Sequence, residues 1–390
     1  MEPENQPLSP QHAPELALPE PGAALEPQAP PPEPQRTPVH WLKWVFIGDQ
    51  GLRAGWSVLI FVALFMLFGR AIGFVFTKTH LLIKGDNQLN IRTGFFGELV
   101  AFLAMVGAAA VVALIERRRI LDYNLTGPRR VPHFFSGLAA GFAALSLLIG
   151  GLVAGGWLHF GPTALSGSNI FLYAAAWAGV FLLVGCVEEG TMRCFFLYTL
   201  ARGLNFWLSA GIVAAICVDL IVRTKGNGVW GVYAIAALGV VPCLLLNLKK
   251  SPSAGFWYAA WVTSTFFGFG HTGNNGENWI GIFTAAFIGF VFCVSVWVTG
   301  SAWWAIGCHA AWDWAETYFY GTADSGFVSP GHYLSTSPAG PVLWSGGSDG
   351  PEGSLLVLPV TILLLVLLLV IYRRRKPAEM AMPVQERLAG

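Results

Sequence analysis

The stretch CVEEGTMRCFF (residues 186–196) places two adjacent glutamates and an arginine inside one of the most apolar regions of the chain. It is preceded by FLYAAAWAGVFLLVG (171–185) and continues into FLYTLARG (196–203). An ionisable side chain at membrane depth costs at least about 2.5 to 3.5 kcal/mol and marks a functional site by default. This stretch therefore predicts a membrane-embedded helix with a functional site in it.

The composition of the whole chain indicates a polytopic membrane protein. Of its 390 residues, 54% are hydrophobic and only 12% are charged, which is far from the composition of a soluble domain. The net charge of +1 provides no basic face for nucleic acid, so membrane lipids are the expected surroundings and no nucleic acid partner is expected. The six cysteines lie singly in apolar runs and form no CxxC pair, so small buried hydrophobes are expected.

Ten apolar runs define the predicted fold. A helix needs about 20 apolar residues to cross about 30 Å of hydrocarbon. The predicted fold class is therefore an all-α, polytopic transmembrane helical bundle with about 10 spans (8–10), near 54–77, 94–116, 133–157, 170–200, 205–222, 229–247, 254–272, 278–298, 300–320 and 353–372. At 1.5 Å per residue, residues 170–202 would be about 50 Å long. That element must therefore tilt, break at Gly190 or begin outside the bilayer.

The predicted organisation has four parts along the chain. A disordered Pro-rich tail (1–40) is followed by two transmembrane helices with a basic cytoplasmic loop (41–130). The core (133–320) comes next, and then a loop, the last helix and a basic tail (321–390). The tail is rich in Pro, Ala and Glu and has too few large apolar residues to offset the entropy of ordering.

The basic clusters predict the orientation in the membrane. ERRR (116–119) and RRRK (373–376) follow the second and last spans, whereas the loop 321–352 has no Lys or Arg. Because cytoplasmic loops carry the excess of Lys and Arg, both termini are expected in the cytoplasm, with a bacterial plasma membrane as the location.

The charges within the spans divide into pairs and one remainder. Glu189 and Arg193 are spaced i, i+4 with the acid first, which predicts a helical ion pair. Glu188 points about 100° around the helix from Glu189 and has no local cation, so it is suited to accept a proton from water. Arg70 and Glu98, in the first two spans, are expected at similar depth as a second ion pair.

Two histidines are also placed within the spans. FGFGH (267–271) ends one span, where Gly268 and Gly270 leave room for close backbone approach. HAAWD (309–313) puts His309 and Asp313 on one helical face. One histidine in an apolar helix is usually a satisfied core residue. Two of them, together with EExxxR and HxxxD patterns, indicate a shared site.

EEGTMR (188–193), FGFGH (267–271) and HAAWD (309–313), in this order, resemble the EExxxR, FxxxH and HxxxN/D motifs of the type 2 CAAX prenyl proteases and their bacterial relatives. This group is the CPBP family of intramembrane proteases, named for CAAX proteases and bacteriocin-processing enzymes. The resemblance covers about 133–320 and implies an intramembrane endopeptidase acting on a protein or peptide, lipidated or not. Relatives need one crossing between the first two motifs and this chain has three, so an extra hairpin is predicted at 205–247.

The resemblance also implies roles for individual residues. Glu188 and His271 would activate a water to attack the scissile carbonyl, and His309 and Asp313 would stabilise the oxyanion. An ionised Asp cannot donate a hydrogen bond, so Asp313 orients His309 or is itself protonated. Supporting roles are implied for Glu189, Arg193 and Phe267.

A metal site and two other functions remain open. Glu188, His271 and His309 form a His2Glu set of the kind that holds catalytic zinc, so the expected cofactor is either none or zinc. Metal-free water activation is favoured because Glu189 is already matched by Arg193 and no partners for the second histidine nitrogens are evident. The alternative functions are a transporter with a Glu/His proton relay and a non-catalytic membrane assembly or immunity-type factor.

Overall fold

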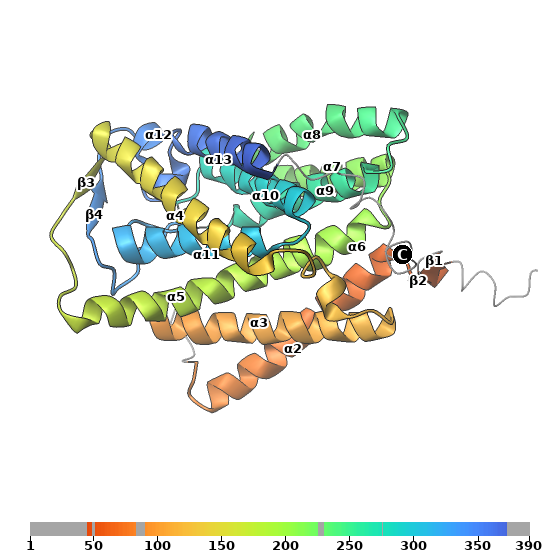
Figure 1. Cartoon of the computed structure of the whole chain (residues 1–390), viewed down its shortest axis with the longest axis horizontal. Helices are drawn as coiled ribbons and strands as arrows, with labels where there is room; N and C mark the ends of the chain where they lie inside the picture. The colour runs from red at the N-terminus through yellow and green to blue at the C-terminus, as the bar shows by residue number, and fades with distance from the viewer. Residues whose placement is uncertain (1–44, 49–50, 83–89, 225–229, 275, 373–390) are drawn as a thin grey trace, which may run out of the picture. The chain divides into compact units, whose positions relative to one another are not determined.

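The computed structural model describes residues 45–48, 51–82, 90–224, 230–274 and 276–372 (Figure 1). The chain divides into two units, Met1–Lys43 and Trp44–Gly390, and every feature below belongs to the second. The predicted Pro-rich tail and the basic C-terminal tail lie outside the described residues.

All ten predicted runs form helices, so the all-α prediction is confirmed (Figure 1). In chain order these are α2 (Ala54–Lys78), α3 (Ile91–Ile115), α4 (Arg130–Ala154), α5 (Ser168–Glu189) continued by η2 (Gly190–Phe196) and α6 (Leu197–Ala201), α7 (Phe206–Thr224), α8 (Trp230–Leu248), α9 (Ala254–His271), α10 (Trp279–Thr299), α11 (Trp303–Trp314) continued by η3 (Ala315–Tyr320), and α13 (Val357–Tyr372).

Short elements complete the described chain. They are β1 (Ile47–Gly48), β2 (Gly51–Leu52), η1 (Ile120–Asp122), β3 (Leu158–Phe160), β4 (Thr336–Pro338), α12 (Val342–Ser345) and η4 (Pro351–Gly353). β1 pairs with β2, and β3 pairs with β4, both antiparallel. The second pair ties the segment after α4 to the long loop after η3.

The number of membrane spans is the part of the fold prediction that is not confirmed. Among the described residues, six helices are long and apolar enough to cross a membrane: Ala54–Lys78, Ile91–Ile115, Arg130–Ala154, Ser168–Ala201, Trp230–Leu248 and Trp279–Thr299. α7 and α13 are apolar but shorter, and α9 and α11 carry the polar residues of two motifs. The protein is an integral, multi-pass membrane protein, and the cytoplasmic position of its termini stays a prediction.

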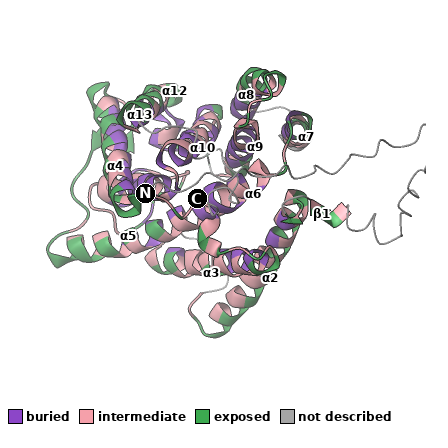
Figure 2. Ribbon diagram, turned by 45° about the vertical axis from the view of Figure 1, so that its right-hand side comes forward, coloured by how far each residue is buried: buried purple, intermediate pink, exposed green. Residues whose placement is uncertain are grey.

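The outward faces of the helices are apolar. Figure 2 shows exposed residues along α8 and α13. Trp230 and Leu248 on α8 and Val370 and Ile371 on α13 are all more than 60% exposed. Such side chains would destabilise a protein in water, but hydrocarbon solvates them without cost. The exposed apolar surface is therefore the lipid-facing surface.

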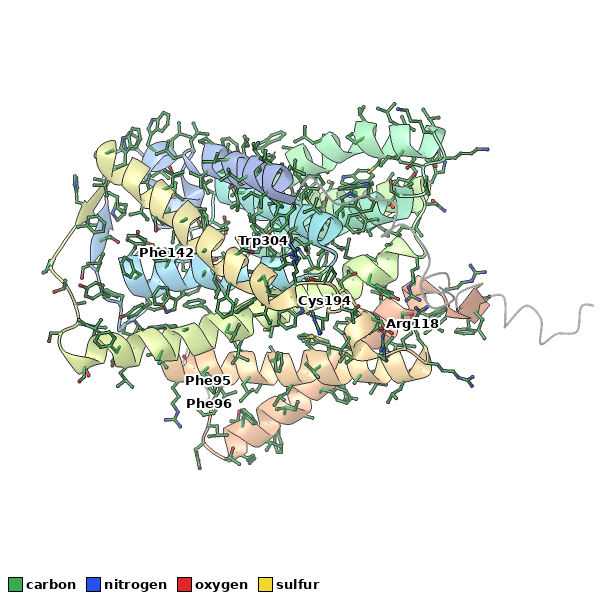
Figure 3. All side chains as sticks on the ribbon, in the orientation of Figure 1. Phe95, Phe96, Arg118, Phe142, Cys194 and Trp304 are labelled. Atoms are coloured by element: carbon green, nitrogen blue, oxygen red, sulfur yellow. The ribbon has the colours of Figure 1, made fainter. Side chains whose placement is uncertain are left out.

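A close contact between two helices positions one of the motif helices. Gly137 and Gly141 form a GxxxG pattern on α4, and a Cβ at these positions would lie 2.2 Å from the Trp304 carbonyl oxygen and 2.1 Å from that of Cys308. Trp304 is labelled in Figure 3, where α4 crosses α11. On its other side α11 approaches α5 at Gly185, whose Cβ would lie 3.0 Å from an α11 carbonyl oxygen. Small residues thus hold α11 between α4 and α5.

The long element that contains the opening stretch changes geometry at Gly190. The helix does not break there; α5 continues as η2, a π-helical segment, and then as α6. α11 changes in the same way and continues as the π-helical η3. π segments inside α-helices occur frequently at functional sites. Here η2 includes the last four residues of EEGTMR, and η3 begins two residues after HAAWD.

The predicted extra hairpin at 205–247 corresponds to α7 and α8, which pack on α9. Their contact is an apolar cluster that includes Phe206, Ala236 and Trp261, and the Trp261 indole N–H donates to the Ala236 carbonyl oxygen at 3.1 Å. Within the described part of this hairpin, no residue lines the cavity described next. The hairpin supports α9 from outside the candidate site.

Candidate active site

A cavity of about 580 Å³ lies within the bundle, and residues of all three motifs line it. Glu188 comes from α5, His271 from the end of α9, and His309 and Asp313 from α11. These positions are far apart in the sequence. The helix packing therefore brings together the residues that the sequence assigned to one site.

Glu189 and Arg193 form the predicted ion pair, with 3.2 Å between Arg193 Nε and Glu189 Oε2. Both side chains are 0% exposed. The guanidinium carbon lies 4.3 Å from the centre of the Phe267 ring and 5.4 Å from that of Phe292. The buried cation is thus stabilised by one carboxylate and two aromatic faces.

Glu189 has a second partner that the sequence did not reveal. Its Oε1 lies 2.9 Å from His309 Nδ1. A carboxylate paired with Arg193 can only accept, so His309 Nδ1 donates this hydrogen bond. The contact fixes the ring orientation and directs Nε2 into the cavity.

His309 Nε2 lies between two further carboxylates. Its distance is 3.8 Å to Glu188 Oε2 and 3.5 Å to Asp313 Oδ2. The Glu188 side chain is 39% exposed, in contrast to the fully buried Glu189. The Phe292 ring stacks on the imidazole at 5.8 Å, and no sequence motif had pointed to this residue. Glu188 is therefore the accessible carboxylate of the adjacent pair.

His271 is oriented by its own helix. Its Nδ1 lies 2.8 Å from the Phe267 carbonyl oxygen, so Nδ1 donates and Nε2 remains available to the cavity. A Cβ at Gly268 would lie 2.7 Å from the Ala286 Cβ, which confirms the predicted close approach there, whereas one at Gly270 would meet nothing within 4 Å. Gly270 instead lines the cavity.

The predicted Arg70–Glu98 ion pair is wrong. Arg70 lies on the exposed face of α2, and the described ion pairs do not include one with Glu98. Glu98 lines the cavity and is close enough to Glu188 and His309 to interact electrostatically with both. The physical reason is that α3 turns its Glu98 face toward α5. The cavity thus extends beyond the 133–320 region.

Glu188, His271 and His309 do not form a compact set of ligand atoms in this structure. Donor atoms of a tetrahedral zinc site lie about 2.0–2.3 Å from the ion and therefore roughly 3.3–3.8 Å from one another. Among the described residues, a different set has ligand atoms within 4.8 Å of one another, namely Glu316, Asp324 and Glu352.

Both site histidines have a hydrogen-bond partner for their second ring nitrogen. The prediction that such partners are lacking is wrong, because Glu189 and the Phe267 carbonyl provide them.

Fold and cavity together define a polytopic membrane protein with glutamate and histidine side chains gathered inside its helical bundle. Residues 243–315 match the family model described as Type II CAAX prenyl endopeptidase Rce1-like. This match confirms the resemblance to the CAAX/CPBP intramembrane proteases, and it includes the FGFGH and HAAWD motifs but not EEGTMR. Comparison with curated proteins and with solved structures gave no match.

Proposed function

We propose that the protein is an intramembrane endopeptidase that hydrolyses a peptide bond with water activated by Glu188 and His271. The observation that carries the proposal is that an accessible carboxylate, Glu188, lies beside His309 in a cavity inside a membrane bundle. The match to an endopeptidase family over 243–315 supports the same reaction class. The substrate is proposed to be a membrane-associated protein or peptide, lipidated or not.

In the proposed reaction, the Glu188 carboxylate accepts a proton from a water that is also hydrogen-bonded to His271 Nε2. The hydroxide formed attacks the scissile carbonyl carbon, and the carbonyl oxygen becomes an oxyanion. When the C–N bond breaks, Glu188 returns the proton to the leaving amine. Every proton that Glu188 takes is thus given back within one cycle.

His309 is proposed to stabilise the oxyanion. When both ring nitrogens carry protons, Nδ1 donates to Glu189, which leaves the Nε2 hydrogen to donate to the oxyanion. Asp313, 3.5 Å from the same Nε2, then orients and stabilises the imidazolium rather than contacting substrate. This arrangement needs no hydrogen bond from the Asp313 carboxylate, so it accommodates Asp in the third motif.

The test is the exchange Glu188→Gln, which keeps the size of the side chain and removes the base. General-base catalysis contributes about 10²- to 10⁴-fold, so cleavage is expected to fall at least about 100-fold at unchanged protein level and melting temperature. Cleavage would be measured on prenylated and unprenylated CAAX peptides in liposomes, and by profiling new termini among host membrane proteins. Glu98→Gln, the same exchange at another carboxyl group that lines the cavity, serves as the control for lost charge alone. Normal cleavage by Glu188→Gln would contradict the proposal.

Removal of zinc by chelation is expected to leave cleavage unchanged, because Glu188, His271 and His309 do not form a compact ligand set. The measurement combines metal analysis of the purified protein with activity before and after chelation. Stoichiometric zinc whose removal abolishes cleavage, and whose return restores it, would overturn metal-free water activation.

Two alternatives explain the buried charges less completely. A proton-relay transporter and a non-catalytic assembly factor both accommodate polar groups inside a bundle. A transporter gives no reason for the match to an endopeptidase family model. A family member without catalysis shares that match, and the Glu188→Gln cleavage test separates it from the peptidase.

A further inference from the structure

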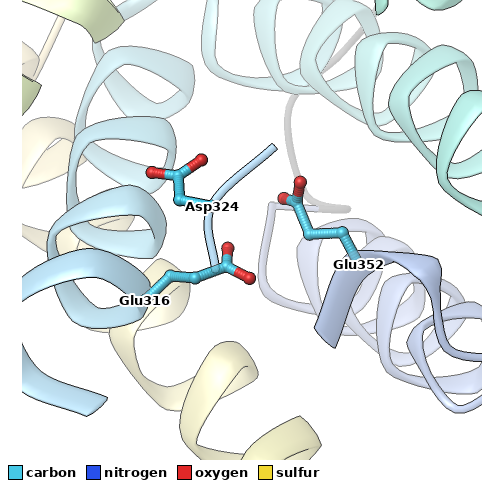
Figure 4. Close-up of side chains that lie close together, drawn as sticks. All are labelled: Glu316, Asp324 and Glu352. Carbon is cyan, nitrogen blue, oxygen red and sulfur yellow. The ribbon is translucent and has the colours of Figure 1, made fainter. Parts of the chain in front are cut away.

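Three carboxylates meet at a second place along the cavity. Glu316 lies on η3, Asp324 on the following loop and Glu352 on η4, and one ligand oxygen from each lies within 4.8 Å of the other two (Figure 4). Glu316 is fully buried. Among the described residues, no Lys or Arg forms an ion pair with any of the three. Three ionised carboxylates at this separation would repel strongly in a buried environment, so either protons or a bound cation must neutralise part of their charge.

Hydrogen-bond donors around the cluster are too few. The single indole N–H of Trp312 lies 3.0 Å from Glu316 Oε2 and 2.8 Å from Glu352 Oε1, so two carboxylates share one donor. The Thr317 hydroxyl donates to Asp324 Oδ2 at 2.8 Å. The Ser325 side chain also hydrogen-bonds to Asp324, but none of these donors serves Glu316 Oε1.

An independent observation points to a missing ligand. Glu316 Oε1 is buried and has no hydrogen-bond partner, although its carboxylate reaches into the cluster (Figure 4). Asp349, next to Glu352, is 1% exposed, and its Oδ1 is also without a partner. Leaving a buried carboxylate oxygen unpaired is costly. A cation coordinated by several of these oxygens would remove this cost.

The surroundings of the cluster hold further carboxyl groups, which favour protonation of the cluster as long as no cation is bound. Glu277 and Asp349 form a neighbouring carboxyl pair joined by a hydrogen bond. Burial, followed by the charge of Asp324, raises the pKa of Glu352 to about 8, and burial followed by Asp349 raises the pKa of Glu277 to about 9. Both groups lie outside the membrane-spanning helices. The same oxygens would stay ionised beside a bound cation.

We propose that Glu316, Asp324 and Glu352 bind a calcium ion. An all-carboxylate set without His or Cys favours a hard cation over zinc. Two of the ligands lie on irregular or single-turn segments, which suits the flexible six- to eight-oxygen coordination of Ca²⁺ better than the strict octahedron of Mg²⁺. Glu188 is not one of the ligands, and the inference does not depend on the proposed peptidase reaction.

A bound Ca²⁺ would join three separate segments at one end of the cavity. Glu316 belongs to the motif helix α11–η3, whereas Asp324 and Glu352 belong to the long connection that leads to α13. Asp324 and Glu352 also line the cavity. The ion would therefore fix this connection against the motif helix and hold the cavity wall in place.

The test is calcium binding by the full chain, purified in detergent and stripped with a chelator. Added Ca²⁺ is expected to raise the melting temperature by at least about 2 °C. Tb³⁺, a calcium substitute, is expected to give luminescence on tryptophan excitation, because the Trp312 indole contacts two of the ligands. Ca²⁺ should displace Tb³⁺ and abolish this signal.

Glu352→Gln is expected to abolish the Ca²⁺ shift and weaken Tb³⁺ binding at least about tenfold. Without Ca²⁺ it should be as stable as the unsubstituted protein, because one of the repelling charges is gone. Glu98→Gln, at another part of the cavity, and Glu188→Gln, which lacks the proposed base, should both keep the shift. The proposal is overturned if Ca²⁺ gives no shift, if Mg²⁺ or Zn²⁺ acts instead of Ca²⁺, or if Glu352→Gln keeps the full shift.

Discussion

Replacing Arg193 by methionine is expected to destabilise the protein by about 3–5 kcal/mol. Arg193 and Glu189 are both 0% exposed, so the exchange leaves the Glu189 carboxylate buried without its cation. Methionine fills much of the same volume against Phe267, so the effect reports the charge more than a cavity. The measurement is thermal unfolding of the purified protein in detergent, together with its level in the membrane.

A matched exchange is available at Arg202. This residue pairs with Glu116 at 3.0 Å, but Glu116 also keeps Arg118 at 3.1 Å and the Ser57 hydroxyl. Arg202→Met therefore leaves its carboxylate partnered, and a clearly smaller loss of stability is expected. Equal melting temperatures for the Arg193 and Arg202 variants would contradict the argument.

The double variant Glu189→Gln/Arg193→Met separates charge from packing. With both charges removed, the uncompensated carboxylate is gone, and part of the lost stability is expected to return. Cleavage is not expected to return with it, because a glutamine at position 189 no longer offers His309 a carboxylate. Recovery of both properties together would contradict the assignment of Glu189 as a positioning residue.

Replacing Gly141 by leucine is expected to cost about 3 kcal/mol or more and to remove cleavage activity. Overpacking typically costs about 1–3 kcal/mol, and more where the backbone must move. A Cβ at Gly141 would lie 2.1 Å from the Cys308 carbonyl oxygen, so no side-chain rearrangement can relieve the clash. α4 and α11 would have to separate, and His309 would leave its position beside Glu188. Membrane level, melting temperature and cleavage measure these effects.

The same helix offers the control for this exchange. Gly150 also lies on α4, but a Cβ there would meet nothing within 4 Å. Gly150→Leu carries the same change in helix propensity and hydrophobicity, and it is expected to retain stability and cleavage. If the two leucine variants behave alike, the backbone contact at Gly141 is not what positions α11.

Local sequence patterns were sufficient to predict the helices and one contact between side chains. Apolar runs predicted each of the ten helices, and the i, i+4 spacing predicted the Glu189–Arg193 pair. Both depend only on residues close together in the chain. The number of spans could not be obtained in this way, because an apolar run predicts a helix but not its length: α11 has only 12 residues and α13 only 16.

Contacts between distant helices could not be predicted from local spacing. Glu189 and His309 are 120 positions apart, and their hydrogen bond depends on α11 lying between α4 and α5. The sequence GLAAG (137–141) was an available signal for that packing. Glu98 was assigned to Arg70 because both lie in neighbouring spans, but spacing does not determine which helix a given face contacts.

The carboxylate cluster was missed for a related reason. The segment 321–352 has turn residues and no Lys or Arg, which is typical of an exposed loop. In the structure it folds back and buries Asp349 and much of Asp324 and Glu352 beside η3. Hydropathy measures the preference of a residue for water. It does not predict that a carboxyl group can be buried when a cation or a proton neutralises its charge.

The hydrogen bond between Glu189 and His309 links the fold to the state of the site. One carboxylate contacts a guanidinium, whose charge is permanent, and an imidazole, whose charge depends on its proton. The Glu189 carboxylate therefore contributes both to the free energy of proton binding at His309 and to the free energy of folding of the bundle. By thermodynamic reciprocity, a change that loosens the bundle around Arg193 must alter proton binding at His309, and the reverse also holds.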